Sequence, residues 1–151
     1  MITCMFAGHR EVLDEDLPQR LRAAIQSLID EEEEICFYTG GMGKFDEICA
    51  REVRMQKGRK DKKQIELILV EPYMKQSINR DGRYLQTQFD DIVIPMELGD
   101  VHYKQAICRR NRWMVEHSQV MIAYVVRNKG GAYEAMRYAQ RCGLRIINTA
   151  L

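Results

Sequence analysis

Glycine residues that could expose backbone donors to an anion gather in three short stretches of the chain, and Arg10 lies in the first of them. The stretches read GHR (residues 8–10), TGGMGKFD (39–46) and RNKGGAYE (127–134), and each follows a short apolar run. Glycine leaves the backbone N–H groups bare, and N–H groups at a helix N-terminus attract negative charge. An arginine guanidinium adds a planar set of donors that suits phosphate. These residue types therefore predict a site for a phosphate or a carboxylate.

The candidate ligand-binding residues come from these stretches and from one long helical segment. We expect backbone donors and clearance from the glycines, charge neutralisation from Arg10 and Arg110, and weaker contacts from Lys44 and Asn111. The full set is Gly8, His9, Arg10, Thr39, Gly40, Gly41, Gly43, Lys44, Asp46, Arg110, Asn111, Gly130, Gly131 and Ala132. A tight corner between a strand and a helix explains any single glycine turn equally well. The prediction therefore depends on the turns meeting around one pocket.

Short apolar segments alternate with amphipathic segments along the whole chain. Strands are expected at 2–7, 34–39, 64–73, 90–96, 119–126 and 144–151, and helices at 14–34, 44–58, 100–118 and 131–142, with a short helix at 81–89. This alternation predicts a single α/β domain over residues 1–151, a three-layer sandwich with a mostly parallel central sheet. Ligands bind such sheets at the carboxyl ends of the strands, where all three stretches fall.

The helical segment at 100–118 places an arginine on its apolar face. At about 100° per residue, one stripe carries Tyr103, Ala106, Ile107, Met114 and His117, with Arg110 near its centre. A guanidinium on the inward face needs a partner. The partner is either a bound anion or a carboxylate such as Asp46, unless the side chain extends to the rim. We expect His117 to be a buried core histidine.

Composition restricts the partners. The chain has 23 basic and 22 acidic side chains, a net charge of +1, which gives no general attraction to nucleic acid. We therefore expect nucleic acid to be an unlikely partner and interpret the basic stretch at 57–63 as a solvated loop. No apolar run approaches the ~20 residues of a membrane span, and charged residues occur too early for a secretory signal, so a cytoplasmic protein is expected.

Metals and cofactors are not expected. The five cysteines form no C-x-x-C pair, and the three histidines are scattered at positions 9, 102 and 117. We interpret the cysteines as reduced and mostly buried thiols. Apolar and aromatic side chains such as Trp113 suggest a homodimer as one possible assembly.

Four motifs in order resemble one known superfamily. GHR, YTGGMGKFD, RRNRWMVEHSQVMIAY and GGAYEAMRYA together resemble the SLOG superfamily, particularly its small YpsA-like members from bacteria and phages. The likeness covers nearly the whole chain. It implies a Rossmann-like domain that binds a nucleotide or nucleotide-derived ligand at the glycine-rich rim. It also implies that Asp46 matches an aspartate of the second glycine motif, which organises the loop or contacts a ribose.

The same superfamily includes the Lonely-guy phosphoribohydrolases and the single-stranded DNA-binding DNA-processing protein A. The resemblance to the former implies catalytic roles for Arg110 and Glu134 if the protein is an enzyme. The chain departs from the phosphoribohydrolase motif Pro-Gly-Gly-x-Gly-Thr-x-x-Glu, because it reads NKGGAYEA and places Ala135 where the motif has glutamate. Glu134 is one position early, which rotates it by about 100° on a helix.

The sequence thus favours a module that binds a nucleotide-like or phosphorylated ribose ligand as a sensor or regulator. A phosphoribohydrolase acting on nucleoside monophosphates is the first alternative. Binding of single-stranded nucleic acid through the basic stretch at 57–63 is the second.

Overall fold

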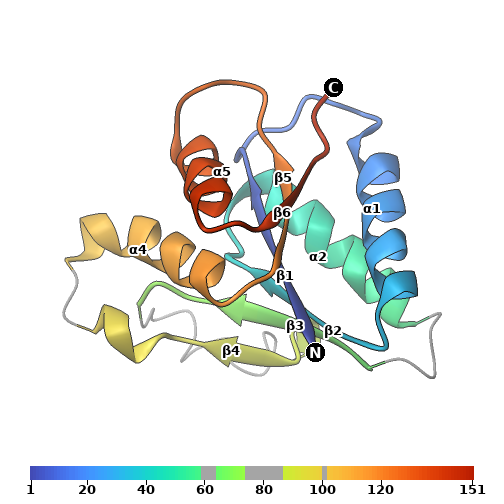
Figure 1. Ribbon diagram of the computed structural model, residues 1–151, viewed down its shortest axis with the longest axis horizontal. Coiled ribbons are helices and arrows are strands. Elements are labelled where there is room, and N and C mark those ends of the chain that lie inside the picture. The colour runs from blue at the N-terminus through green and yellow to red at the C-terminus, as the bar shows by residue number, and fades with distance from the viewer. Residues whose placement is uncertain (59–63, 74–86, 100–101) are drawn as a thin grey trace.

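The apolar segments form the strands of one six-stranded parallel sheet. Figure 1 shows the computed structural model, which describes residues 1–58, 64–73, 87–99 and 102–151. The strands are β1 (Ile2–Gly8), β2 (Glu34–Thr39), β3 (Gln64–Val70), β4 (Asp91–Val93), β5 (Val120–Tyr124) and β6 (Arg145–Asn148). Their order across the sheet is β4-β3-β2-β1-β5-β6, and all five pairings are parallel. The predicted Rossmann-like α/β fold is confirmed.

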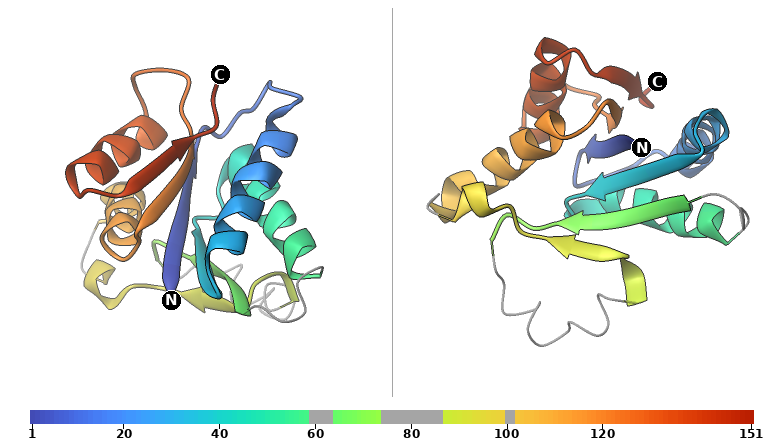
Figure 2. Two further views of the ribbon diagram at one scale, coloured as in Figure 1. Left: turned by 45° about the vertical axis from the view of Figure 1, so that its right-hand side comes forward. Right: turned by 60° about the horizontal axis from the view of Figure 1, so that its bottom comes forward.

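Helices cover both faces of this sheet. They are α1 (Leu17–Glu31), α2 (Gly43–Lys57), α4 (Tyr103–Glu116) and α5 (Gly131–Arg141), with a short 3-10 helix, η1, at Met96–Leu98. Figure 2 shows α1 and α2 on one side of the strands and α4 and α5 on the other. Most of the short helix expected at 81–89 and the basic stretch at 57–63 lies outside the described residues.

The side chains of each strand point alternately to the two faces of the sheet, and this divides the core into two clusters. In β1, Cys4 and Phe6 face α1 and α2, whereas Met5 and Ala7 face α4 and α5. Successive side chains of a strand point to opposite faces, so a strand covered on both sides must be apolar throughout. Aromatic rings fill the first cluster, and the rings of Phe6 and Phe37 stack 5.6 Å apart.

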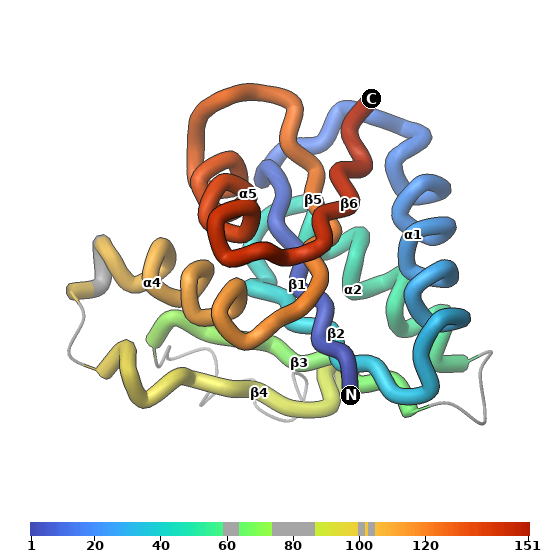
Figure 3. The backbone as a smooth tube through the Cα atoms, viewed as in Figure 1, coloured from blue at the N-terminus to red at the C-terminus, as the bar shows by residue number. Residues whose placement is uncertain are grey.

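The carboxyl ends of the strands form the edge at which the predicted site residues gather. Figure 3 traces the loops after β1 and β5, which lie side by side at the top of the view. The backbone N–H of Lys44 donates to the carbonyl of Arg10 at 2.8 Å, so the start of α2 is joined to the loop after β1. Gly43 permits this approach because a Cβ there would lie 2.6 Å from the Cα of Arg10. The single domain over residues 1–151 stays a prediction.

Gly8 is required by packing, and Gly131 is not. An alanine Cβ at position 8 would lie 2.3 Å from the ring of Phe45, whereas one at position 131 would meet no atom within 4 Å. We predict that Gly8→Ala lowers the free energy of unfolding by about 1–3 kcal/mol, since the buried ring must move. Gly131→Ala should leave stability unchanged or raise it by about 0.4–1 kcal/mol. Urea denaturation of both variants measures the difference, and equal effects would contradict this packing account.

Candidate functional site

A cavity of about 580 Å³ opens where β1, β2, α4 and α5 meet, and we call it the rim cavity. Its lining includes most of the predicted site, namely Gly8, His9, Arg10, Gly40, Asp46, Arg110, Asn111, Gly130, Gly131 and Ala132. It also includes Phe6, Ala7, Glu11, Met42, Ile107, Met114 and Arg127, which were not predicted. The crevice at the carboxyl edge of the sheet is therefore present, and it brings together residues from distant parts of the chain.

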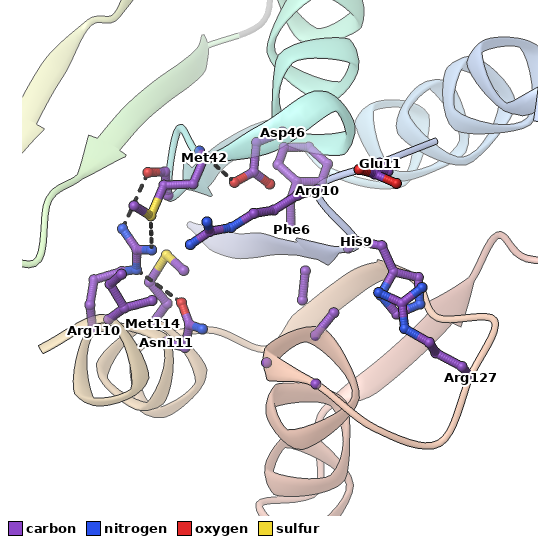
Figure 4. Close-up of a pocket in the computed structure, with 17 residues that line it drawn as sticks. Phe6, His9, Arg10, Glu11, Met42, Asp46, Arg110, Asn111, Met114 and Arg127 are labelled. Carbon is purple, nitrogen blue, oxygen red and sulfur yellow. Dashed lines mark hydrogen bonds between the residues drawn. The ribbon is translucent and has the colours of Figure 1, made fainter. Parts of the chain in front are cut away.

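Arginines exceed carboxylates around the rim cavity. Arg10, Arg110 and Arg127 line it, against Glu11 and Asp46. Figure 4 shows the guanidinium of Arg10 reaching across the cavity toward Arg110, with Arg127 on the far side. Among the described residues, the side chains of Arg10 and Arg127 make no hydrogen bond or ion pair. Two guanidinium groups without carboxylate partners, next to that of Arg110, favour a negatively charged ligand.

The first turn of α5 supplies backbone donors on the same cavity. This helix has no side-chain cap at its N-terminus, and Gly130, with φ 97°, takes a conformation that suits glycine. The Cβ position of Gly131 is open space. Uncapped N–H groups at a helix start carry partial positive charge. This end of the cavity can therefore accept an anion close to the backbone.

The corner at the start of α2 differs, because other groups of the protein already accept hydrogen bonds from its backbone N–H groups. The N–H of Met42 donates to Oδ2 of Asp46 at 3.0 Å, and the N–H of Gly41 donates to Oγ1 of Thr39 at 3.2 Å. Lys44 N–H is already bonded to Arg10. The sequence predicted donors for a ligand at both corners. The backbone donors at α5 remain available in the structure, whereas the α2 donors described above are already bonded within the protein.

A second cavity of about 500 Å³, which we call the side cavity, lies behind that corner. It is lined by Thr39, Gly41, Gly43, Lys44, Asp46, Glu47, Ala50, Arg54, Gln88 and Phe89. The predicted residues Thr39, Gly41, Gly43 and Lys44 thus face the side cavity, whereas Gly40 and Met42 face the rim cavity. Asp46 lines both. The glycine segment at 39–46 is therefore a thin wall between two cavities.

Arg110 joins α4 to the ends of two strands. Its side chain is only 2% exposed, and Nη1 donates to the carbonyls of Val70 (2.8 Å) and Gly40 (3.2 Å). Nε donates to Oδ1 of Asn111 at 2.9 Å, and Nη2 contacts the sulfur of Met42 at 3.3 Å. Burial lowers the pKa of Arg110, and the negative charges of Asp46 and Glu71 oppose this effect. Four of the five N–H donors of the guanidinium are thus engaged within the chain.

Asp46 is a buried carboxyl with unusual acidity. Burial raises its pKa to about 6, although the hydrogen bond from Met42 and the charge of Arg110 favour the ionised form. Its Oδ1 has no hydrogen-bond partner among the described residues and is not sealed from solvent. A carboxylate oxygen is therefore available as an acceptor where the two cavities adjoin.

His9 is held in its neutral form. Its side chain is 4% exposed, and Nε2 accepts a hydrogen bond from the N–H of Val126 at 3.0 Å. Burial and the positive charge of Arg127 both lower its pKa. Because Nε2 accepts, the proton of the neutral ring resides on Nδ1. This bond fixes the segment that carries Arg127 against the loop after β1.

Glu134 and His117 do not lie where the sequence predicted. Glu134 is exposed and absent from the lining, so the available carboxylates are Glu11 and Asp46. His117, expected in the core, is exposed and stacks on Trp113 with ring centres 4.1 Å apart. It follows the end of α4 at Glu116, and its Nδ1 lies 2.7 Å from the carbonyl oxygen of Trp113.

Arg127, Arg54 and Phe89 were missed. Arg127 had a readable signal, because a cation in the loop after a parallel strand lies at the same edge as the other candidates. Arg54 and Phe89 meet through tertiary contacts that periodicity does not reveal.

Neither a metal site nor a membrane span is found in the described part of the chain. No three His, Cys, Asp or Glu side chains there are placed to hold a metal ion, and none of the helices there could cross a bilayer. The expected absence of a metal or cofactor, and the possible homodimer, stay predictions.

Comparisons with known proteins support the fold. No family model and no curated protein matches the chain. A structure of DNA processing protein A from Helicobacter pylori, described for its single-stranded DNA binding mode, superposes with TM-score 0.64, 17% identity and 96% coverage of this chain. DNA processing protein A from Streptococcus pneumoniae superposes with TM-score 0.66, 15% identity and 96% coverage. The chain spans only 63% and 49% of these two proteins.

This likeness corrects one expectation from composition. A net charge of +1 led us to expect that nucleic acid is an unlikely partner. A protein that shares the fold over 96% of this chain binds single-stranded DNA, so that expectation is wrong. The error lay in using the whole-chain charge, whereas anion binding depends on the local charges around the site. Fold likeness agrees with the SLOG resemblance, and membership of the YpsA-like group stays a prediction.

Removal of Arg110 should destabilise the protein. Arg110→Met keeps most of the volume but leaves the buried carbonyls of Gly40 and Val70 without their donor, so we expect a loss of about 3 kcal/mol in unfolding free energy. Arg109→Met, which changes an exposed neighbour on the same helix, is the matched control and should cost little. Urea denaturation compares them. Equal stability of the two variants would show that the Arg110 contacts contribute nothing.

The raised pKa of Asp46 predicts a pH-dependent stability. Its contribution is fully present below about pH 4, the unfolded value, and is lost as the pH rises through about 6. The unfolding free energy of the wild type relative to Asp46→Asn should therefore fall by on the order of 3 kcal/mol between pH 4 and pH 7. Glu47→Gln, at an exposed neighbouring carboxylate, is the control for the removal of one charge. A pH-independent difference for Asp46→Asn would refute the assignment.

Proposed function

We propose that the protein binds single-stranded nucleic acid and holds a backbone phosphate in the rim cavity. The observation that carries this proposal is the pair of arginines, Arg10 and Arg127, that face the cavity without a carboxylate partner among the described residues. The uncapped start of α5 adds backbone donors on the same side. DNA processing protein A binds single-stranded DNA, and this supports a strand, rather than a single nucleotide, as the ligand.

Local charge is sufficient for this function. A phosphate that enters the cavity gains charge-assisted hydrogen bonds from guanidinium groups, and these are stronger than bonds between neutral groups. Binding also releases the cations that are condensed on the phosphates of the strand, so the affinity must fall as the salt concentration rises. Because a strand presents phosphates at every nucleotide, one well-formed phosphate site can engage it without recognising a particular sequence.

A free nucleotide is the second candidate ligand. The cavity volume of about 580 Å³ falls within the range of small-molecule sites, and the lining mixes apolar side chains with a few polar groups. The same phosphate contacts serve either ligand. A role as a nucleotide sensor or regulator would follow if the mononucleotide bound more tightly than the strand.

The geometry does not support Arg110 and Glu134 as the catalytic pair of a phosphoribohydrolase. Glycosidic cleavage needs a carboxyl group at the reacting centre, and Glu134 does not line the cavity. Four donors of Arg110 are also engaged within the chain.

Arg10→Ala and Arg127→Ala should each weaken strand binding about tenfold, because each removes a charge-assisted hydrogen bond to phosphate. The dependence of binding on salt should also become shallower by about one counterion. Fluorescence anisotropy of a labelled single strand across a salt series measures both effects.

Arg51→Ala is the charge-matched control, since Arg51 is an exposed arginine of α2 outside both cavities. It should leave the affinity within about twofold of the wild type. A uniform loss in all three variants would indicate general electrostatic attraction alone and would reject the cavity as the site. Competition by nucleoside monophosphates in the same assay ranks the two candidate ligands.

A further inference from the structure

The side cavity has a lining that suits a flat, uncharged ring. Its charged residues balance, with Lys44 and Arg54 against Asp46 and Glu47. Lys44 and Glu47 also pair with each other at 3.4 Å. The rim cavity, by contrast, has an excess of arginines. A phosphate therefore gains more in the rim cavity, and the side cavity lacks the unbalanced positive charge that would hold a second one.

One wall of the side cavity is a stacked cation and aromatic ring. The guanidinium carbon of Arg54 lies 5.1 Å from the centre of the Phe89 ring, and its Nε donates to the carbonyl of Gln88 at 2.8 Å. The hydrogen bond anchors the guanidinium beside the ring. Aromatic rings and guanidinium planes are the groups on which nucleobases stack in single-stranded complexes.

The wall between the cavities brings such a base close to the phosphate site. Residues of the glycine segment alternate between the two sides, and Asp46 lines both cavities. The free Oδ1 of Asp46 can accept a hydrogen bond from an N–H group on the edge of a base. A nucleotide with its phosphate in the rim cavity can thus extend around this thin wall.

We propose that the side cavity is a nucleobase pocket in which a base stacks against Arg54 and Phe89 while a phosphate of the same strand occupies the rim cavity. This inference rests on the proposed nucleic-acid binding and adds a contact to the base that phosphate binding alone does not require. Stacking tolerates every base, because each has a π-face, so the pocket senses the presence of a base more than its identity.

The test uses two labelled single strands of equal length and equal phosphate count, one with normal bases and one with abasic sites throughout. The wild-type protein should bind the normal strand about fivefold more tightly or better, as expected for one stacked base. Phe89→Leu keeps apolar volume but removes the π-face. It should bind both strands with the affinity that the wild type has for the abasic strand.

Tyr138→Leu is the matched control, because Tyr138 carries the guanidinium groups of Arg112 and Arg141 outside both cavities. It should preserve the preference for the normal strand. Arg54→Lys provides a second variant that leaves Phe89 in place, and it should reduce the preference because the guanidinium plane is lost. Thermal unfolding of each variant confirms that it is folded.

The outcomes separate the base pocket from the phosphate site. Equal binding of the two strands by the wild type, or an equal loss for both strands in Phe89→Leu, would overturn the base pocket and leave the phosphate site intact. A wild-type protein that binds neither strand would overturn both proposals. A preference that survives Phe89→Leu and Arg54→Lys would place the base contact elsewhere and would also reject this inference.

Discussion

The buried guanidinium of Arg110 holds together the edge of the sheet at which both cavities open. It bonds the carbonyl of Val70, at the end of β3, and that of Gly40, directly after β2. No apolar side chain could satisfy two buried carbonyls from different strands, and a lysine lacks the planar fork that reaches both. The cation fixes α4 against the strand ends and thereby sets the position of the wall formed by 39–46.

The two groups of glycines at this edge serve different purposes. Gly40, Gly41 and Gly43 are needed by the protein itself, because a Cβ at each would lie less than 3 Å from Arg110, Leu69 or Arg10. Gly131 faces open space and has no such constraint. The sequence could not distinguish a tight corner from a turn with exposed backbone donors. The structure has the tight corner at 39–46 and a helix start without a side-chain cap at 130–132.

Much of the fold follows from local patterns, whereas the site depends on long-range contacts. The apolar runs and helical stripes predicted all six strands and the four long helices, because each pattern reflects burial of that segment alone. The third strand stops at Val70 rather than continuing to residue 73, next to the proline at position 72. Two features of the site depend on tertiary contacts, which hydrophobic periodicity does not reveal. One is the bonding of the α2 donors to Arg10 and Asp46, and the other is the pairing of Arg54 with Phe89.

The separation of constrained from unconstrained glycines has a consequence for divergence among relatives. Substitutions in the wall at 39–46 disturb packing on both of its sides, so this segment should tolerate little drift. The segment from Val126 to Glu134 begins with an exposed residue, and a Cβ added at Gly131 would meet no atom within 4 Å. Substitutions in this segment can therefore alter the preferred ligand while the scaffold remains unchanged. Proteins that share this fold can in this way come to bind different ligands.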